Sequence, residues 1–173
     1  MKEKLDALVQ KYTETVQAHF RWLHTHPELS GQEKKTAAYI ASVLRDMGLE
    51  PMEGIGGYGV VALIHGKAPG RCVALRADMD ALPIQEENDI PFKSKLDGQM
   101  HACGHDGHTA VLLGAVKALY EYHKTNPLSC RIAAVFQPSE EGMATGARIM
   151  VENHLMDEID FIIGGHLNGG IDT

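Results

Sequence analysis

The chain has 173 residues, of which 44% are hydrophobic and 23% charged, which suits one folded domain of ordinary size. Its formal net charge of -7 argues against a nucleic-acid partner, because phosphate contacts require clustered lysine and arginine side chains. The first ten residues lack the apolar stretch of a secretion signal, and no apolar run approaches the roughly 18 residues needed to cross a membrane. We therefore expect a cytoplasmic protein with no membrane partner.

The N-terminal part of the chain reads as two helices. Apolar residues recur at three- and four-residue steps over residues 3–26, which predicts an amphipathic helix. The polar residues at 24–28 are mostly explained by a helix end followed by a cap. Ser30 and Glu33 have the spacing of a capping box, in which each side chain would satisfy a backbone donor at the start of a second helix. We expect that helix to run to about residue 47, with Gly48 as its C-cap.

Short β-rich runs follow, separated by turns rich in glycine and proline. The runs at residues 59–64 and 71–76 flank the sequence Gly-Lys-Ala-Pro-Gly at 66–70, and we interpret them as a hairpin. Two further runs, 130–136 and 159–164, are nearly continuous in apolar character, as buried strands tend to be.

One helical segment precedes each of these later runs. Residues 109–122 are apolar on almost every face and should be buried between layers, whereas residues 145–154 are more amphipathic. Strands that alternate with helices predict an α/β fold, here a layered sandwich with a mixed sheet flanked by helices. Three cysteines cannot all pair, and Cys72 and Cys130 lie in apolar runs, so we expect no disulfide framework.

The stretch at residues 100–110, MHACGHDGHTA, has the composition of a metal site. It places three histidines, one cysteine and one aspartate just ahead of an apolar run. Thiolate and neutral imidazole are preferred ligands of zinc and related divalent ions, and the two glycines let neighbouring side chains face one ion. The alternative is a polar loop before a helix, but loops seldom concentrate histidine and cysteine in this way without a metal or a catalytic task.

Polar residues also follow the predicted strands, where open α/β sheets place their sites. After the run at 71–76 come Asp78 and Asp80: one could bind a metal, or both could orient a ligating imidazole. A turn rich in aspartate before a proline explains the same spacing equally well. His166 follows the run at 159–164, and its position at a strand end favours a metal ligand over a surface histidine.

Adjacent carboxylates follow the strand predicted at 130–136. Of Glu140 and Glu141, one can ligate a metal while its neighbour acts as a general base toward a bound water. The alternative is a helix N-terminus, where acidic residues favour the macrodipole. Their place after a buried strand, in a chain that also carries a His/Cys cluster, favours the catalytic interpretation.

Together these motifs resemble the N-terminal part of the metal-dependent aminoacylase and carboxypeptidase superfamily. The resemblance is to the branch of hippurate hydrolases, N-acyl-amino-acid amidohydrolases and auxin-conjugate hydrolases. The pieces occur in the family's order and span nearly the whole chain: residues 24–33, 78–83, 100–110, 136–141 and 165–166. The resemblance implies a zinc-peptidase-like fold, of which residues 1–173 would form the N-terminal part of the catalytic domain.

The resemblance also implies a site. In the complete enzyme we expect two divalent metal ions, manganese or zinc, whose ligands here would be Cys103, His105, Glu141 and His166. Glu140 would be the general base, and Asp80 would support the ligands. The implied reaction is hydrolysis of the amide bond of a small N-acyl amino acid or peptide-like substrate by a metal-activated water. Cys103 would be bound as a thiolate, since a cation at such a site enforces deprotonation.

Parts of the family's pattern lie outside these residues. Family members are more than twice as long, with a lid or dimerisation domain, a C-terminal part of the catalytic domain and a last histidine ligand that are absent here. After His166 the family usually continues through prolines, whereas this chain reads LNGGIDT at 167–173. We therefore expect weak metal affinity, little turnover by these residues alone, and self-association through uncovered sheet and helix surfaces.

Two hypotheses of different class follow. The first is the N-terminal part of an amidohydrolase, and the second is a non-catalytic metal-binding or assembly module derived from such a hydrolase. A thiol redox protein is a third possibility, but Cys103 has no partner in a CxxC motif and is flanked by imidazoles.

Overall fold

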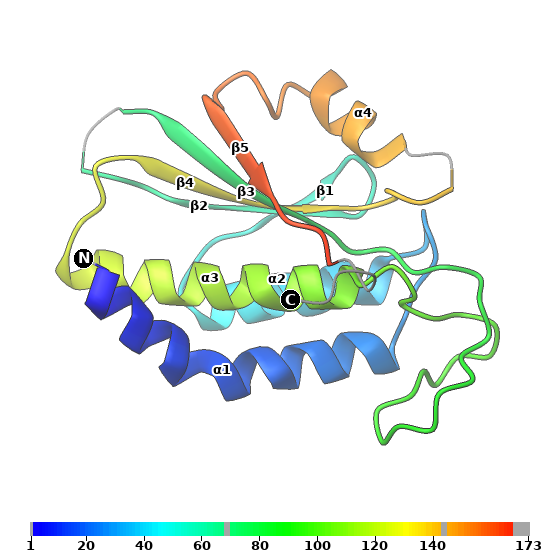
Figure 1. The fold of residues 1–173 in the computed structure, drawn as a ribbon. Helices are drawn as coiled ribbons and strands as arrows, with labels where there is room; N and C mark the ends of the chain where they lie inside the picture. The colour runs from blue at the N-terminus through cyan, green and yellow to red at the C-terminus, as the bar shows by residue number, and fades with distance from the viewer. Residues whose placement is uncertain (1, 68–69, 143–144, 168–173) are drawn as a thin grey trace.

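The computed structural model describes residues 2–67, 70–142 and 145–167. A single sheet has α2 and α3 on one face, with α1 packed against α3, and α4 on the other face (Figure 1). The helices are α1 (Lys2–Thr25), α2 (Lys34–Asp46), α3 (His105–Thr125) and α4 (Thr145–Glu152). The strands are β1 (Met52–Ile55), β2 (Gly59–Ile64), β3 (Cys72–Asp78), β4 (Arg131–Gln137) and β5 (Phe161–Gly164). The predicted α/β fold, a mixed sheet flanked by helices, is confirmed.

The sheet has the strand order β1-β2-β4-β3-β5. Strand β4 pairs antiparallel with β2 and parallel with β3, and β3 pairs in parallel with β5. The hairpin predicted for 59–64 and 71–76 is therefore wrong, because β4 lies between the two strands. Every residue of β4 after Arg131 is buried. Its position at the centre of the sheet therefore removes its apolar surface from water. Residues 68 and 69 of the predicted turn lie outside the described residues.

The main core lies between the sheet and the helices α2 and α3. Its largest fully buried apolar side chains are Ile40, Leu44, Met79, Leu113 and Phe136. A smaller core under α4 is centred on Val61, Ala74, Val135 and Met150. Together these two cores hold the sheet rigid, and the ends of its strands can therefore fix functional side chains in place.

Helix α3 begins four residues earlier than its apolar pattern predicts. Gly104 has a φ of +86°, a left-handed conformation that glycine adopts without a Cβ penalty, and the helix starts directly after it. His105 and His108 consequently lie on the first turn of α3, and both are buried. The first part of the helix is buried between α1 and the sheet, as predicted, except that Val111 is 61% exposed. From Leu119 onward its residues are half-buried or exposed.

The capping box predicted for Ser30 and Glu33 does not form. Glu33 precedes the first residue of α2, but no side-chain hydrogen bond caps that end from this position. Instead Glu28 Oε2 accepts hydrogen bonds from the backbone N–H and the hydroxyl of Thr36, at 2.8 and 2.9 Å. At the other end of α2, Gly48 has a φ of +92°, as expected for its C-cap.

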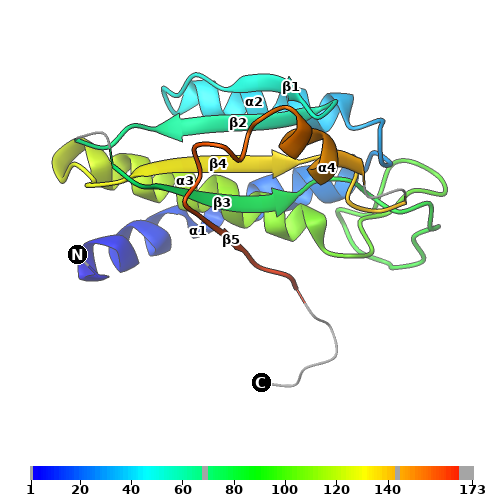
Figure 2. The same ribbon diagram turned by 90° about the horizontal axis from the view of Figure 1, so that it is seen from above.

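Strand β5 lies at the edge of the sheet and is exposed along its whole length (Figure 2). The strand occurs where the sequence predicts it, but its predicted burial is wrong: Phe161, Ile162 and Ile163 are 54%, 51% and 59% exposed. Within the described part of the chain it pairs only with β3, which leaves its outer edge open. None of the described helices is long and apolar enough to cross a membrane.

Candidate metal centre

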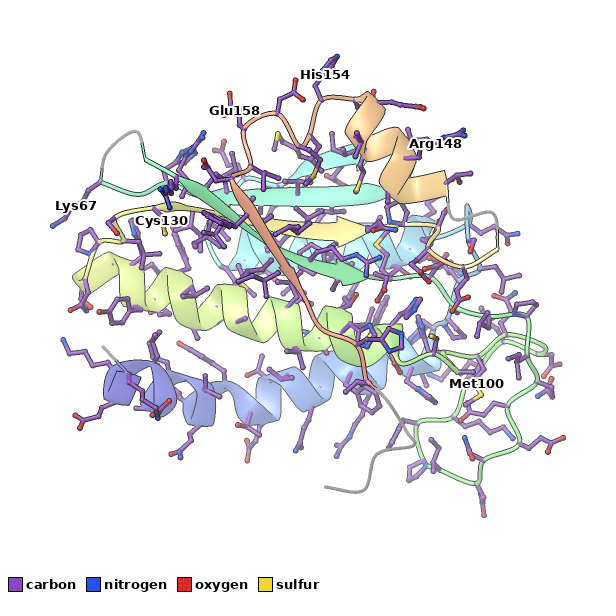
Figure 3. The ribbon with its side chains drawn as sticks, turned by 45° about the horizontal axis from the view of Figure 1, so that its top comes forward. Lys67, Met100, Cys130, Arg148, His154 and Glu158 are labelled. Atoms are coloured by element: carbon purple, nitrogen blue, oxygen red, sulfur yellow. The ribbon has the colours of Figure 1, made fainter. Side chains whose placement is uncertain are left out.

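The polar segments identified in the sequence meet at one end of the sheet. Because β3, β4 and β5 run parallel, the residues that follow them emerge at the same edge, next to the first turn of α3. Met100, at the start of the His/Cys stretch, lies at this end of the molecule in Figure 3, whereas Lys67 and Cys130 lie at the opposite end. The arrangement brings together all six residues predicted for the site.

His105 is the most deeply placed of them, with no exposed surface. Its ring Nδ1–H donates to the carbonyl oxygen of Asp80 at 2.9 Å and lies 3.2 Å from Oδ1 of the same residue. Its Nε2 has no hydrogen-bond partner within the described ranges. That nitrogen lies 3.8 Å from Oε2 of Glu140 and 3.8 Å from Oε1 of Glu141. A buried ring nitrogen without a hydrogen-bond partner, facing carboxylates, suits a metal ligand better than a satisfied core histidine.

Cys103 and His166 complete the same cluster. The Sγ of Cys103 lies 3.4 Å from Nε2 of His166, and the Nδ1–H of that ring donates to the Leu167 carbonyl at 2.7 Å. This tautomer leaves Nε2 of His166 without a hydrogen, so that its lone pair faces the Cys103 thiol. Cys103, His105 and His166 offer ligand atoms within 4.8 Å of one another, and so do His105, Glu140 and Glu141. The donor set of thiol, imidazole and carboxylate therefore fits a divalent ion.

Asp80 supports two of these residues at once. Its Oδ2 accepts hydrogen bonds from the Ser30 hydroxyl at 2.6 Å and from the Glu141 backbone N–H at 2.8 Å, while its other polar atoms hold His105. Burial alone would raise its pKa, but these bonds outweigh burial and lower the pKa of Asp80 to about 2. The carboxylate stays charged at neutral pH and fixes both neighbours relative to one another.

Asp78 and His108 form a hydrogen-bonded pair that adjoins the cluster, because Asp78 Oδ2 lies 3.6 Å from Nε2 of His105. The His108 Nδ1–H donates to Asp78 Oδ1 at 2.6 Å, and its Nε2 accepts from the Leu167 N–H at 2.8 Å. Both ring nitrogens are thus used, so His108 differs from the two candidate ligands. Arg76 donates to Asp78 Oδ2 at 2.7 Å. Burial opposes ionisation of Asp78, but the His108 bond and the nearby cations hold its pKa below the usual range.

The cluster is short of positive charge. Burial, a hydrogen bond with Glu141 and the negative charges of Glu141, Glu140 and Asp78 raise the pKa of Cys103 to about 11. His101, deeply buried nearby, is held neutral because burial lowers its pKa to about 4, and neither of its ring nitrogens has a partner in the described parts. A cation would compensate the carboxylates and favour the thiolate, so the electrostatics agree with the geometry.

Sequence reasoning missed a buried network behind the cluster. His24, at the end of α1, donates from Nδ1 to Asp106 Oδ2 at 2.6 Å and from Nε2 to Glu86 Oε1 at 3.1 Å. Glu86 also accepts from the Ser94 backbone N–H at 2.6 Å, which ties the loop before the His/Cys stretch to α1. The hydrogen bond to Asp106, with help from Glu86, outweighs burial and raises the pKa of His24.

Replacing His24 with glutamine should destabilise the protein most at low pH. Because the folded pKa of His24 is raised above its ordinary value near 6.5, its charge contributes fully below that pH, and the contribution is lost as pH rises through the folded pKa. Unfolding free energies from urea titrations between pH 5.5 and 9 should show the difference between the two proteins shrinking as pH rises. A pH-independent difference would contradict this; His154→Gln, at an exposed position, is the control.

The chain is similar in sequence to a family of known proteins. The model of "Peptidase family M20/M25/M40" matches residues 74–173. An N-acyl-L-amino acid amidohydrolase of Geobacillus stearothermophilus is 46% identical over 166 residues, covering 96% of this chain and 44% of that protein. Thermostable carboxypeptidase 2 of Saccharolobus solfataricus is 44% identical over 168 residues, covering 96% of this chain and 42% of that protein.

A solved structure resembles this chain in both fold and sequence. The YxeP protein of Bacillus subtilis, described as a dinuclear metal binding peptidase from the M20 family, matches with a TM-score of 0.87 and 39% identity. The match covers 94% of this chain and 45% of that one. The chain therefore spans less than half the length of each of these three relatives.

Proposed function

This chain belongs to peptidase family M20/M25/M40, as its motifs suggested, and from that premise we propose that it forms the N-terminal part of the catalytic domain of a metal-dependent amidohydrolase. Its substrates would be small N-acyl amino acids or related peptide-like amides. The observation that supports this best is the buried Nε2 of His105, which has no partner in the described ranges and faces two carboxylates. The name of the Geobacillus stearothermophilus relative supports the substrate class.

The residues that would hold the ions are Cys103, His105, Glu141 and His166. A bound divalent ion supplies positive charge that polarises a carbonyl group and lowers the pKa of a water molecule. Cysteine and histidine favour zinc, while carboxylate is also compatible with manganese. Asp80 would contribute indirectly, by orienting His105 and the backbone of Glu141.

Glu140 would act as the general base. Its Oε2 lies 3.8 Å from Nε2 of His105, and its side chain is 41% exposed, so it can meet both the cluster and an incoming substrate. The carboxylate would take a proton from the water that attacks the amide carbon and return it to the leaving nitrogen. A carbon–oxygen bond forms as the carbon–nitrogen bond breaks, which yields a carboxylic acid and a free amine.

A non-catalytic metal-binding or assembly module is the second candidate. The exposed apolar residues of β5 favour it, because an edge strand with uncovered apolar side chains tends to pair with another chain. Such a module would keep the metal cluster for stability and would self-associate through this strand.

One combined measurement separates these candidates. We would determine metal content by elemental analysis and hydrolysis of N-acetyl and N-benzoyl amino acids, using the whole polypeptide in which these residues occur. The amidohydrolase should contain zinc or manganese and release the free amino acid, and chelation should stop the reaction. Bound metal without hydrolysis of any of these amides would favour the module. Failure to bind either ion would contradict both candidates.

Metal binding should release a proton from Cys103. With a pKa of about 11 in the metal-free protein, this thiol is neutral at pH 7.5, whereas a metal ligand must be a thiolate. Calorimetric titration with Zn²⁺ in buffers of different ionisation enthalpy should show release of about one proton that Cys103→Ser abolishes. Affinity should therefore rise with pH by up to about tenfold per unit. Equal proton release by the two proteins would contradict a thiolate ligand; Cys130→Ser is the control.

A further inference from the structure

We propose that Glu33 is a positioning residue for the acidic pair Glu140 and Glu141: through Ser139 it fixes the turn that directs both carboxylates toward His105. The inference rests on the proposed function, since the pair needs this orientation to ligate an ion and to act as a base. Glu33 is not one of the candidate ligands, so its effect is carried by the backbone of the turn.

The surroundings of Glu33 indicate that its side chain holds together parts of the chain that are distant in sequence. The residue has no exposed surface, although a carboxylate is costly to bury unless hydrogen bonds compensate it. Its side chain does not cap α2, at whose start it lies. Its Oε1 accepts hydrogen bonds from the Ser139 backbone N–H at 2.7 Å and from the Ser139 hydroxyl at 3.1 Å. Its Oε2 has no partner in the part of the chain that the structure describes. The long-range hydrogen bonds of the Glu33 side chain within the described residues are thus both made with Ser139.

Ser139 is the residue at which the chain turns into the site. It has a φ of +51°, in the left-handed region that residues other than glycine rarely adopt, and it stands between the end of β4 and Glu140. Such a conformation persists where the surroundings hold it, and strained backbone of this kind clusters at functional sites. The two hydrogen bonds to Glu33 restrain its N–H and hydroxyl, and its carbonyl oxygen accepts from the Gly146 N–H at 3.2 Å.

The same turn is held from its other side by Asp80 and Ser30. Asp80 accepts from the Glu141 N–H at 2.8 Å, and the Ser30 hydroxyl, which donates to Asp80 at 2.6 Å, also lies 3.2 Å from the Glu141 carbonyl oxygen. Residues 30 and 33, which the sequence suggested were a local helix cap, thus hold the two ends of the acidic turn. Releasing the Ser139 end should let both carboxylates move away from His105.

Cobalt binding tests this inference, because Co²⁺ reports both affinity and ligand geometry through its visible spectrum. The whole polypeptide would be titrated as the unsubstituted protein, as Glu33→Met, which keeps the length of the side chain but accepts no hydrogen bond, and as Glu33→Gln, which keeps an acceptor oxygen. We expect Glu33→Met to weaken Co²⁺ binding about 10- to 100-fold and to alter the spectrum. Glu33→Gln should restore most of the affinity.

Glu28→Met is the matched control. Glu28 caps the same helix through Thr36 but forms no hydrogen bond with Ser139, so this variant should lose stability while binding Co²⁺ within about twofold of the unsubstituted protein. An equal loss of affinity in Glu28→Met and Glu33→Met would overturn the inference, as would unchanged affinity in Glu33→Met.

Two outcomes need separate treatment. Should Glu33→Met fail to fold, Ser139→Ala would replace it, because removal of the hydroxyl leaves the backbone bond in place. Ser139→Ala should weaken Co²⁺ binding several-fold. Unchanged affinity in this variant would overturn the inference. Absence of Co²⁺ binding from the unsubstituted protein would contradict the proposed function and the inference with it. Binding by that protein together with insensitivity to Glu33 would contradict the inference alone.

Discussion

Substitution of His105 by asparagine should abolish most metal binding, raising the dissociation constant for Zn²⁺ or Mn²⁺ by more than about 100-fold. Loss of a residue that merely orients a ligand typically costs 10- to 100-fold, and His105 offers a ligand nitrogen itself. The asparagine amide can still donate to the Asp80 carbonyl as Nδ1 of the ring does, so the fold should survive while Nε2 is lost. Calorimetry with each ion, alongside a thermal melt, measures the two effects separately.

The control for this experiment is His24→Gln. His24 is also buried, but it bonds to Asp106 and Glu86 and contributes no atom to the cluster. Its replacement should leave affinity within a few-fold of the unsubstituted protein. If His105→Asn binds the ion as tightly as the control does, His105 is not a ligand and the ion is held by other residues.

Substitution of Glu140 by glutamine should lower kcat for hydrolysis of an N-acyl amino acid about 10²- to 10⁴-fold without changing metal content. That range is the usual contribution of a general base, and the isosteric amide cannot accept a proton. Steady-state kinetics on the whole polypeptide, with elemental analysis of the same samples, measure both quantities. The neighbouring variant Glu141→Gln should lose metal as well as rate, because Glu141 is the expected ligand.

This pair of variants separates the two roles. A Glu140→Gln protein that loses its metal would show that this carboxylate, rather than its neighbour, binds the ion. A Glu140→Gln protein that retains the full rate would exclude it as the base.

Local patterns predicted most of the elements and the composition of the cluster. Helix α1 followed from three- and four-residue apolar steps, and the strand ends placed Glu141 and His166 near the His/Cys stretch because parallel strands finish at one edge. The roles of these residues stay predictions. Strand order was less accessible, since the pairing of β4 with both β2 and β3 depends on burial over long sequence separations.

The supporting residues could not be predicted because their partners are remote. Ser30 bonds to Asp80 and Glu33 bonds to Ser139, while their own spacing imitates a helix cap. His24 likewise reads as the end of an amphipathic helix, and only the folded chain brings it to Asp106. Contacts between residues far apart in the sequence leave no local periodicity. The helix-cap and helix-end interpretations were therefore reasonable locally but missed the tertiary contacts of these residues.

The position of His166 immediately beyond β5 has a thermodynamic consequence. One candidate ligand follows the most exposed strand of the sheet, which is hydrogen-bonded on one side in the described ranges, while His105 lies in the rigid interior. Ion binding and the ordering of that strand are therefore linked equilibria. An ion that binds His166 stabilises β5, and any contact that orders β5 strengthens ion binding by the same free energy. The order of the sheet edge would then control how tightly the metal centre binds its ion, although His105 lies in the core.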